Sequence, residues 1–511
     1  MASSPLDAIR GHDGTARSSD RGPDDGPFGP PERGAATRSG AHRVTADLLY
    51  HVDQPSASAQ AVLSFLFDSL GIAARSCPPP GLWERPHLVY GDSTRPGALG
   101  IAIPRRRGDV FWGDVLRGGL PTVASDGSIP FDLIGAIEAL LTDVVHGDVP
   151  PADLDRHGRL SYGASRPARE GFGDMPIVNV YVECLRRILA DRLAVVGRPR
   201  WPDGRVAAIA LSHDVDMPDK YALLGSAIRP WRLRRHPRTY VRKSIELARQ
   251  RATDPTPRDH WLFDAVADSE SSLGFRSTFF FATVPFHAAV GAPWDVAYDV
   301  RGRPYRRVLA SLVDGGFEIG LHASYRAHED PSRLAAERGL LETLTKRTVT
   351  GVRHHYWHLG SDVARTLRAH EGAGFTYDSS LAFNDHIGYR RAIALPFHPF
   401  DAELGRPLRT LQLPTFCMDG NLFGAVDNVD AAVEAVVTAI NVIVSTGGMG
   451  AINWHIQTSY PGNRQFRMWG TVYQEILRWL ASRTDIWVTR LGDIATWVSR
   501  EHSSAAVGGL P

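Results

Sequence analysis

The sequence has little cysteine and no long apolar run, and both absences bear on where the protein works. Its three cysteines, Cys77, Cys184 and Cys417, are scattered over 511 residues and form no CxxC pair. This argues against a disulfide framework and fits a reducing compartment. The N-terminus lacks the apolar core of a signal peptide, and no stretch approaches the ~20 apolar residues of a membrane span. We therefore expect a cytoplasmic protein with no membrane span.

The sequence also lacks an excess of charge of one sign. The formal net charge is +1 at pH 7, so no global attraction to nucleic acid or to an anionic membrane is expected. Basic residues gather only in residues 229–243, which hold seven arginines and lysines. We interpret this segment as a solvated insertion, with contact to an anionic surface as the alternative. The sequence has no P-loop, no GxGxxG after a strand and no GxSxG, so nucleotide-binding and serine-hydrolase functions lack support.

Composition divides the chain into four parts. Residues 1–44 are rich in Gly, Pro, Ser, Asp and Arg and lack hydrophobic periodicity, which is typical of a disordered tail because little apolar surface can be buried. Residues 45–195 predict an accessory α/β domain, and the turn-rich GRPRWPDG that follows it is typical of a linker. Residues 204–500 form the largest globular part, and residues 501–511 are expected to be a disordered tail.

Within the accessory domain, apolar residues recur at the spacing of amphipathic helices. The expected helices cover residues 61–70, 131–145 and 176–193, and the expected strands cover 87–90 and 99–103. No segment of this domain resembles an active site.

Residues 204–500 alternate strand-like and helix-like segments some seven times. This alternation predicts a parallel sheet, either a distorted (β/α) barrel of about seven to eight strands or a doubly wound sheet. The expected strands are 206–216, 276–284, 317–324, 349–357, 375–383, 408–416, 449–457 and 485–491, and the expected helices include 332–347, 429–444 and 466–482. Polar residues cluster at the strand ends, in HDVD, LHAS, RHHYW, YDSS and WHIQ. In barrels, catalytic residues sit at those ends.

Two aspartates at the end of the first of these strands are candidates for catalysis. The alternation of a strand places Asp214 and Asp216 on the same face, about 7 Å apart. When two carboxylates are aimed at one point, one can bind a divalent metal while the other acts as general base. The competing interpretation is a turn in which an aspartate caps the following helix.

Histidines stand at three further strand ends. His322 ends one apolar strand, His354 and His355 end the next, and His455 ends a late one. A strand-end histidine is a ready metal ligand, although a lone one is more often a packed or surface residue. Histidines recur at several strand ends of residues 204–500, and packing alone does not readily explain this recurrence.

The motifs HDVD, TFFFAT, EIGLHASY, GVRHHYW, YDSSL and INWH follow in this order over about 240 residues. They resemble the NodB-homology polysaccharide deacetylases (carbohydrate esterase family 4), and most closely the subgroup whose first motif reads THDVD. The segments FDLIGAIEALL, DRHGRLSYGASR and PIVNVYVECLRRIL are similar to the accessory domain of that subgroup. The resemblance covers most of residues 45–500. It implies a distorted (β/α) barrel that hydrolyses an N-acetyl or O-acetyl group with one divalent metal ion, for which we expect zinc.

By position, the resemblance also implies catalytic roles. Asp214 matches the catalytic base, and Asp216 matches the metal-binding aspartate. His322 matches the first histidine of the family's H-x-x-x-H motif, and His455 matches the late histidine that acts as general acid.

Two further residues are implied to support the base. Arg353 matches the arginine that pairs with the base and orients it, and Asp378 matches the aspartate that braces this arginine. We therefore expect a buried ion pair between Arg353 and Asp378.

The sequence departs from the family pattern at the metal site. Arg326 stands four residues after His322, where the family has a second metal-binding histidine, and His328 lies two residues further on. His355 replaces the proline of the family's R-x-P-Y motif. Catalytic zinc normally takes three protein ligands. We expect Asp216, His322 and His355 as ligands, with His328 as the alternative to His355.

We therefore expect a metal-dependent hydrolase that removes an acetyl group from an N-acetylated sugar or polysaccharide, breaking a C–N bond other than a peptide bond. The alternatives are an inactive barrel of the same type that binds glycans, and a hydrolase of a non-sugar amide. Tyr356 is expected to bind substrate, and a nearby backbone N–H is expected to stabilise the oxyanion. Trp454 is expected to stack on the substrate. The expected partner is a carbohydrate or small amide, and no nucleic acid.

Overall fold

A computed structural model describes residues 48–77, 87–92, 100–105, 124–125, 127–142, 150–221, 237–285, 292 and 294–507. The tail predicted over 1–44 lies outside these residues, as does most of the basic segment 229–243. Residues Val44–Pro511 form one compact unit. No helix in the described ranges is long and apolar enough to cross a membrane.

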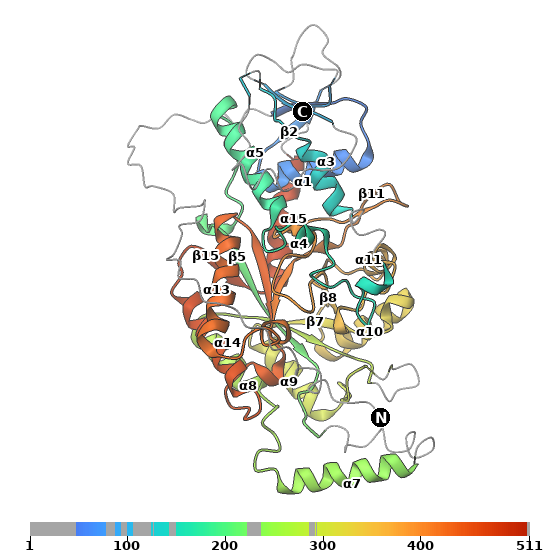
Figure 1. The fold of residues 1–511 in the computed structure, drawn as a ribbon. Coiled ribbons are helices and arrows are strands. Elements are labelled where there is room, and N and C mark those ends of the chain that lie inside the picture. Colours follow the sequence, from blue (N-terminus) through green and yellow to red (C-terminus); the bar gives the residue numbers. More distant parts are fainter. Residues whose placement is uncertain are drawn as a thin grey trace. The chain divides into compact units, whose positions relative to one another are not determined.

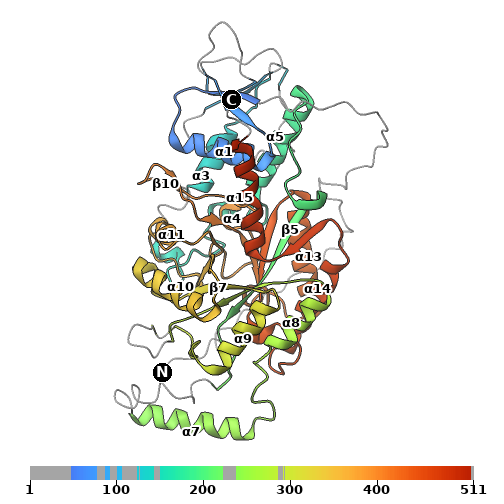
Figure 2. The same cartoon turned by 180° about the vertical axis from the view of Figure 1, so that it is seen from behind.

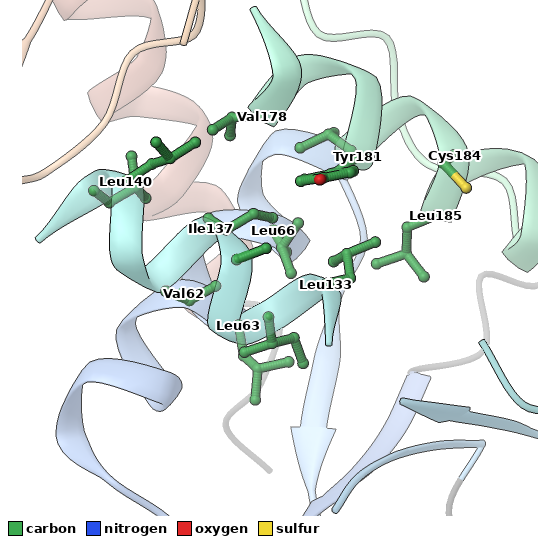
Figure 3. Close-up of a cluster of buried hydrophobic side chains, with 14 of the residues drawn as sticks. Val62, Leu63, Leu66, Leu133, Ile137, Leu140, Val178, Tyr181, Cys184 and Leu185 are labelled. Atoms are coloured by element: carbon green, nitrogen blue, oxygen red, sulfur yellow. The ribbon is translucent and has the colours of Figure 1, made fainter. Parts of the chain in front are cut away.

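The accessory elements form a small parallel sheet covered by helices. The strands are ordered β2-β1-β3-β4, and their bounds are Leu48–Val52 (β1), Ala74–Ser76 (β2), Leu88–Tyr90 (β3) and Ile101–Ile103 (β4). The helices are Ala57–Leu70 (α1), Leu133–Leu141 (α3), Arg166–Arg169 (α4) and Ile177–Leu193 (α5). Figure 3 shows the apolar faces of α1, α3 and α5 meeting in one buried cluster. The expected strands and helices of this region are thus present.

Helix α1 shows how local sequence sets these elements. Ser56 caps its N-terminus by accepting a hydrogen bond from the Ala59 N–H, and Gly71 ends it in the left-handed region at φ 66°. A side chain at Gly71 would meet the backbone of Arg198 within 3 Å, so this turn requires glycine both for its conformation and for its close packing.

A larger, wholly parallel sheet follows the order β12-β9-β8-β7-β6-β5-β14-β13, with β15 also paired to β5. The strands are Ala207–Val215 (β5), Thr278–Phe281 (β6), Glu318–Ala323 (β7), Gly351–His354 (β8), Tyr377–Asp378 (β9), Leu411–Gln412 (β12), Thr415–Met418 (β13), Met449–Asn453 (β14) and Ile486–Thr489 (β15). A separate two-stranded hairpin pairs Phe400–Asp401 (β10) with Arg406–Pro407 (β11).

One segment of chain closes this sheet. Residues 411–412 pair with β9, and residues 415–418, just past Pro414, pair with β14. Because Pro414 lacks an N–H, the strand changes partner at that residue. The two sheet edges are thereby joined, and the sheet curls into a distorted barrel, which confirms the predicted fold and excludes the doubly wound alternative.

Helices surround the barrel (Figures 1 and 2). They are Phe263–Ser272 (α8), Arg303–Asp314 (α9), Pro331–Thr345 (α10), Val363–Gly372 (α11), Asp419–Leu422 (α12), Val429–Ser445 (α13), Arg467–Ala481 (α14) and Leu491–Val507 (α15). Helix Pro237–Thr253 (α7) is not part of this layer. Apolar side chains fill the layer between helices and strands. Helix α15 continues to Val507, so the tail expected from residue 501 is helical over most of its length.

Polar contacts join the accessory elements to the barrel. The amide of Asn179 on α5 donates to the Ala394 carbonyl at 3.0 Å and accepts the Ala394 N–H at 2.9 Å. Arg200 donates to the carbonyls of Ser69 and Gly447. The domain boundary between residues 195 and 204 stays a prediction, since both sides belong to one compact unit.

Candidate metal centre and active site

The ends of β5, β7, β8 and β14 meet at one edge of the barrel and bring the strand-end motifs together. Asp214 lies within β5, next to its end, and Asp216 follows the strand directly. His322 lies on β7, His355 follows β8, and His455 lies two residues after β14. Parallel pairing places all carboxyl ends on the same side, so residues far apart in sequence share one site.

Three of these side chains form a cluster with metal-ligand character. One ligand atom from each of Asp216, His322 and His355 lies within 4.8 Å of the others. The Asp216 carboxylate lies 3.2 Å from His322 Nε2 and 3.3 Å from His355 Nε2. His322 Nδ1 is 3.0 Å from the Arg353 carbonyl, and because a carbonyl only accepts, Nδ1 carries a proton and Nε2 is the ring nitrogen available to a metal ion.

The buried atoms and the charge of this cluster fit a bound metal ion. The buried Asp216 Oδ1 and His322 Nε2 have no hydrogen-bond partner of good geometry among the described residues, and such buried orphan atoms require explanation. Burial by itself would raise the pKa of the Asp216 carboxyl, but His355 and His322 reverse this and hold its pKa well below its usual range. An anionic oxygen and two imidazole nitrogens in this arrangement suit zinc.

His328, the alternative ligand, lies elsewhere. Its Nδ1 contacts the Tyr325 carbonyl at 3.2 Å, and its ring packs edge-on against His358 with centroids 4.4 Å apart. Arg326 faces solvent and pairs with Glu329. The described metal-ligand cluster therefore contains His355 and not His328.

Asp214 is held on both sides of its carboxylate. Arg353 Nη1 donates to Oδ1 at 3.1 Å, and Asn453 Nδ2 donates to Oδ2 at 2.7 Å. Only 3% of Asp214 is exposed, and burial would raise its pKa. The positive charges of His322 and Arg353 outweigh burial and lower the pKa, so this carboxyl is ionised at neutral pH.

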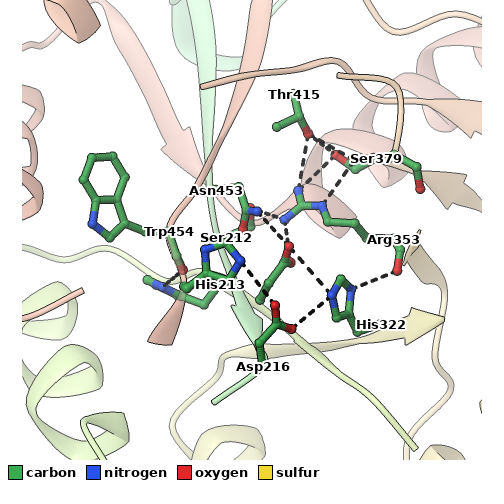
Figure 4. Close-up of polar contacts among 12 residues, drawn as sticks. Ser212, His213, Asp216, His322, Arg353, Ser379, Thr415, Asn453 and Trp454 are labelled. Carbon is green, nitrogen blue, oxygen red and sulfur yellow. Dashed lines mark hydrogen bonds and ion pairs between the residues drawn. The ribbon is translucent and has the colours of Figure 1, made fainter. Parts of the chain in front are cut away.

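Arg353 is braced by hydroxyl groups and a carbonyl, and the expected ion pair with Asp378 is wrong. Its guanidinium donates to Ser212 Oγ, Ser379 Oγ and the Ser379 carbonyl, with Thr415 Oγ1 at 3.4 Å. Figure 4 shows Arg353 pointing between Ser379 and Thr415 while Asp216 faces His322.

Strand alternation gives the reason for this correction. Asp378 pairs in register with Val352, so Ser379, and not Asp378, shares a face with Arg353. Asp378 points to the opposite face. There it accepts a hydrogen bond from Ser380 and lies 3.9 Å from His370.

His455 is oriented by Asp419, a residue that lies outside the strand-end motifs of the sequence. His455 Nδ1 lies 2.7 Å from one oxygen of Asp419, and the His455 N–H donates to the other at 2.9 Å. Nε2 faces Asp216 at 3.3 Å. Burial would lower the pKa of His455, but Asp419, helped by Asp216, raises it well above its ordinary value. This imidazole is therefore held in its protonated form.

Of the two expected substrate-binding residues, only Tyr356 lies at the site surface. It is half-buried, its ring lies 4.7 Å from that of His355, and its backbone is left-handed at φ 59°. Trp454 is fully buried in an apolar cluster and packs against Tyr473. Trp454 therefore offers no face to a substrate, because alternation turns it away from the side on which Asn453 reaches Asp214.

No family model matches the sequence, and no curated protein matches it. Solved structures do match. One is a Mycobacterium smegmatis protein assigned to the polysaccharide deacetylases, with 18% identity over 59% of this chain and 93% of that chain and a TM-score of 0.38.

Two further solved structures are similar. One is the Puue allantoinase, with 15% identity over 60% of this chain and 94% of that chain and a TM-score of 0.40. The other is a CE4 family pseudoenzyme from Bacillus anthracis, with 10% identity over 58% of this chain and 67% of that chain and a TM-score of 0.29.

Proposed function

We propose that this protein is a metal-dependent hydrolase that removes the acetyl group from an N-acetylated sugar or polysaccharide. The observation that carries the proposal is the cluster of Asp216, His322 and His355 beside Asp214, whose carboxylate is aligned by Arg353. These residues offer a site for one metal ion and a general base, and His455 would add the general acid that cleavage of an amide also requires.

Asp216, His322 and His355 would hold the ion, which we propose to be zinc. When bound, a divalent ion polarises the acetyl carbonyl and makes a water molecule more acidic. The hydrogen bond from His322 Nδ1 to the Arg353 carbonyl fixes that ring's tautomer and orientation, which is the usual support of a metal-binding histidine.

Asp214 would act as the general base. Its lowered pKa keeps it ionised, and its bonds to Arg353 and Asn453 fix its oxygens at the barrel mouth. A positioned base takes the proton of the attacking water as the C–O bond forms.

His455 would act as the general acid. Asp419 holds it protonated, and the proton on Nε2 faces the site. Donation of this proton to the amide nitrogen, as the C–N bond breaks, releases a neutral amine. A backbone N–H near Tyr356 would stabilise the negative charge that develops on the acetyl oxygen.

The sequence has only three scattered cysteines and no CxxC pair, which supports the further proposal that the protein works in a reducing compartment such as the cytoplasm. Neither a non-sugar amide substrate nor glycan binding without catalysis is favoured by a particular observation. Both are outcomes of the following test.

The test combines metal content with acetate release. The full chain is stripped with a chelator and reloaded with zinc. Bound metal is then counted, and acetate release is followed on a panel of N-acetylated sugars and on small non-sugar amides. We expect about one ion per chain and release of acetate only by the reloaded protein. Asp214→Asn is the control, since it removes the base and leaves the metal ligands intact.

Three results would contradict the proposal in different ways. Failure to retain metal would exclude the metal centre. Retention of metal with hydrolysis of only non-sugar amides would reassign the substrate. Retention of metal without any hydrolysis would indicate a glycan-binding barrel.

A further inference from the structure

A turn from the accessory part of the chain reaches the mouth of the candidate active site. An antiparallel bridge between Leu154 and Leu160 closes this turn. Inside it, Asp155 accepts the N–H groups of His157 at 2.8 Å and Arg159 at 3.0 Å. Arg159 in turn donates to the Tyr356 carbonyl at 2.7 Å. The turn is thus internally bonded and fastened to the loop that follows β8.

His157 links this turn to the barrel. The ring is buried, and its Nε2 lies 3.1 Å from Arg156 Nε while its Nδ1 lies 2.8 Å from the Tyr325 hydroxyl. Because Arg156 only donates, Nε2 accepts and the ring proton sits on Nδ1. The Tyr325 oxygen then accepts from His157, and the hydroxyl's own hydrogen is left for a ligand.

Aromatic rings lead from the metal cluster to the surface. The ring of Tyr356 lies 4.7 Å from that of His355, and His157 lies 4.8 Å from Tyr356. Trp294 meets His157 edge-on at 5.2 Å, and it also lies 6.2 Å from both Tyr325 and Tyr356. Although it sits among other rings, 41% of Trp294 is exposed. An exposed indole that continues a catalytic site provides a flat apolar face on which a sugar ring can stack.

Arg156 adds a free positive charge to this surface. Its guanidinium carbon lies 5.7 Å from the Trp294 ring, and it is exposed. Its terminal nitrogens have no carboxylate partner among the described residues, whereas the neighbouring Arg159 is paired with Asp155. A guanidinium presents two parallel N–H groups that match the geometry of a carboxylate.

We propose that Trp294, Tyr325 and Arg156 form a subsite for a carboxylated sugar unit attached to the N-acetylated sugar. This inference rests on the proposed function and names its substrate class, an acidic heteropolysaccharide. The indole stacks on the sugar ring, the Tyr325 hydroxyl donates to it, and Arg156 binds the carboxylate.

The experiment compares two defined oligosaccharides of equal length. A hyaluronan tetrasaccharide alternates N-acetylglucosamine with glucuronate, whereas chitotetraose contains only N-acetylglucosamine. Binding to the full, zinc-loaded chain is measured by calorimetry in the Asp214→Asn background, which prevents turnover. We expect the acidic probe to bind about tenfold more tightly at low salt, the usual worth of one charge-assisted hydrogen bond.

The variants assign this preference to residues. Arg156→Gln should abolish the tenfold preference and leave chitotetraose binding unchanged, while Trp294→Ala should weaken both probes. Arg326→Gln is the matched control, because Arg326 is also exposed but is paired with Glu329. Equal binding of the two probes, a preference that survives Arg156→Gln, or an unaffected Trp294→Ala protein would overturn the subsite.

This readout separates the subsite from the proposed function. Acetate release by the protein with wild-type Asp214 tests the hydrolase, while calorimetry tests only binding. If the binding pattern is found without acetate release, the subsite holds and the hydrolase fails. If acetate is released but the acidic probe is not preferred, the hydrolase holds and the subsite fails.

Discussion

Asp419 offers the sharpest test of the catalytic site, because its contacts separate charge from geometry. One oxygen receives His455 Nδ1 at 2.7 Å, and the other receives the His455 N–H at 2.9 Å and the Thr458 hydroxyl. Asp419→Asn keeps the shape and an accepting oxygen but removes the negative charge. Bound metal would offset the charge of Asp216, and Asp419 would then be the main anion that keeps His455 protonated.

The expected magnitude follows from the proposed role of His455 as general acid. Asp419 raises the pKa of His455, so its removal lowers that pKa and His455 loses its proton at a lower pH. Above the new pKa the amine leaves without a proton donor. General acid catalysis contributes roughly 10²–10⁴-fold, so kcat should fall by this factor at alkaline pH, which is about 3–5 kcal/mol of transition-state stabilisation. The loss should shrink as the pH is lowered.

The assay is the pH profile of kcat for acetate release, with metal content measured in the same samples. Asp419→Asn should move the alkaline limb to lower pH and retain its metal, because Asp419 is not among the clustered ligands. Thr458→Ala is the control, since it removes one hydrogen bond to Asp419 and keeps the charge. A uniform loss of kcat at every pH, or a profile like that of the wild type, would refute our assignment of His455 as an acid tuned by Asp419.

Substitutions at the proposed metal ligands, at the proposed base and at Glu337 have different expected outcomes. Asp216→Asn should lose metal while Asp214→Asn retains it and loses roughly 10²–10⁴-fold in turnover, and equal metal loss in both would show that the division of labour is wrong. His355→Ala should release metal during dialysis against a chelator while His328→Ala does not, and the reverse would exclude His355 as the third ligand. Burial raises the pKa of Glu337 from 4.5 to about 7, so the folded state binds more protons between these values and the free energy of unfolding falls by about 3 kcal/mol as the pH rises through them. Glu337→Gln should remove this fall in urea unfolding at pH 5 and pH 8, and an unchanged difference would contradict the raised pKa.

Strand existence was predictable from the sequence, whereas strand ends were not. The segment predicted as a strand over 349–357 is a strand only at Gly351–His354. Its end is set by left-handed backbone at Tyr356 and Trp357, with φ of 59° and 49°. Such a conformation costs about 1–3 kcal/mol per residue and persists only when its surroundings impose it. Here the hydrogen bond from Arg159 to the Tyr356 carbonyl helps to impose this conformation. Hydrophobic periodicity in the sequence does not predict that contact.

The site was predictable where strand ends alone decide position. Asp214, Asp216, His322, His355 and His455 converge because parallel strands end at the same edge. Roles that depend on the facing of a side chain were harder to assign. Asp378 and Ser379 are adjacent in sequence, and only the register with β8 decides which of them reaches the arginine.

Asp419 was missed, although the same rule would have found it. It follows directly on β13 and therefore lies at the edge of the barrel that holds His455. The expected strand stopped at residue 416, three residues short of the aspartate, so the acidic residue was not read as part of a strand-end motif. A hydrogen-bond partner for each strand-end histidine would have been the signal to seek.

The two departures from the family pattern can be understood together. Arg326 stands where the family has a histidine, and it faces solvent beside Glu329. His355 stands where the family has proline, a residue without a donor atom, and its Nε2 lies 3.3 Å from Asp216. Relative to the pattern that the motifs resemble, a histidine is absent after β7 and another is present after β8. Since these strands are neighbours in the sheet, His355 reaches the cluster from the strand next to that of His322, and the proposed metal centre would still have three protein ligands.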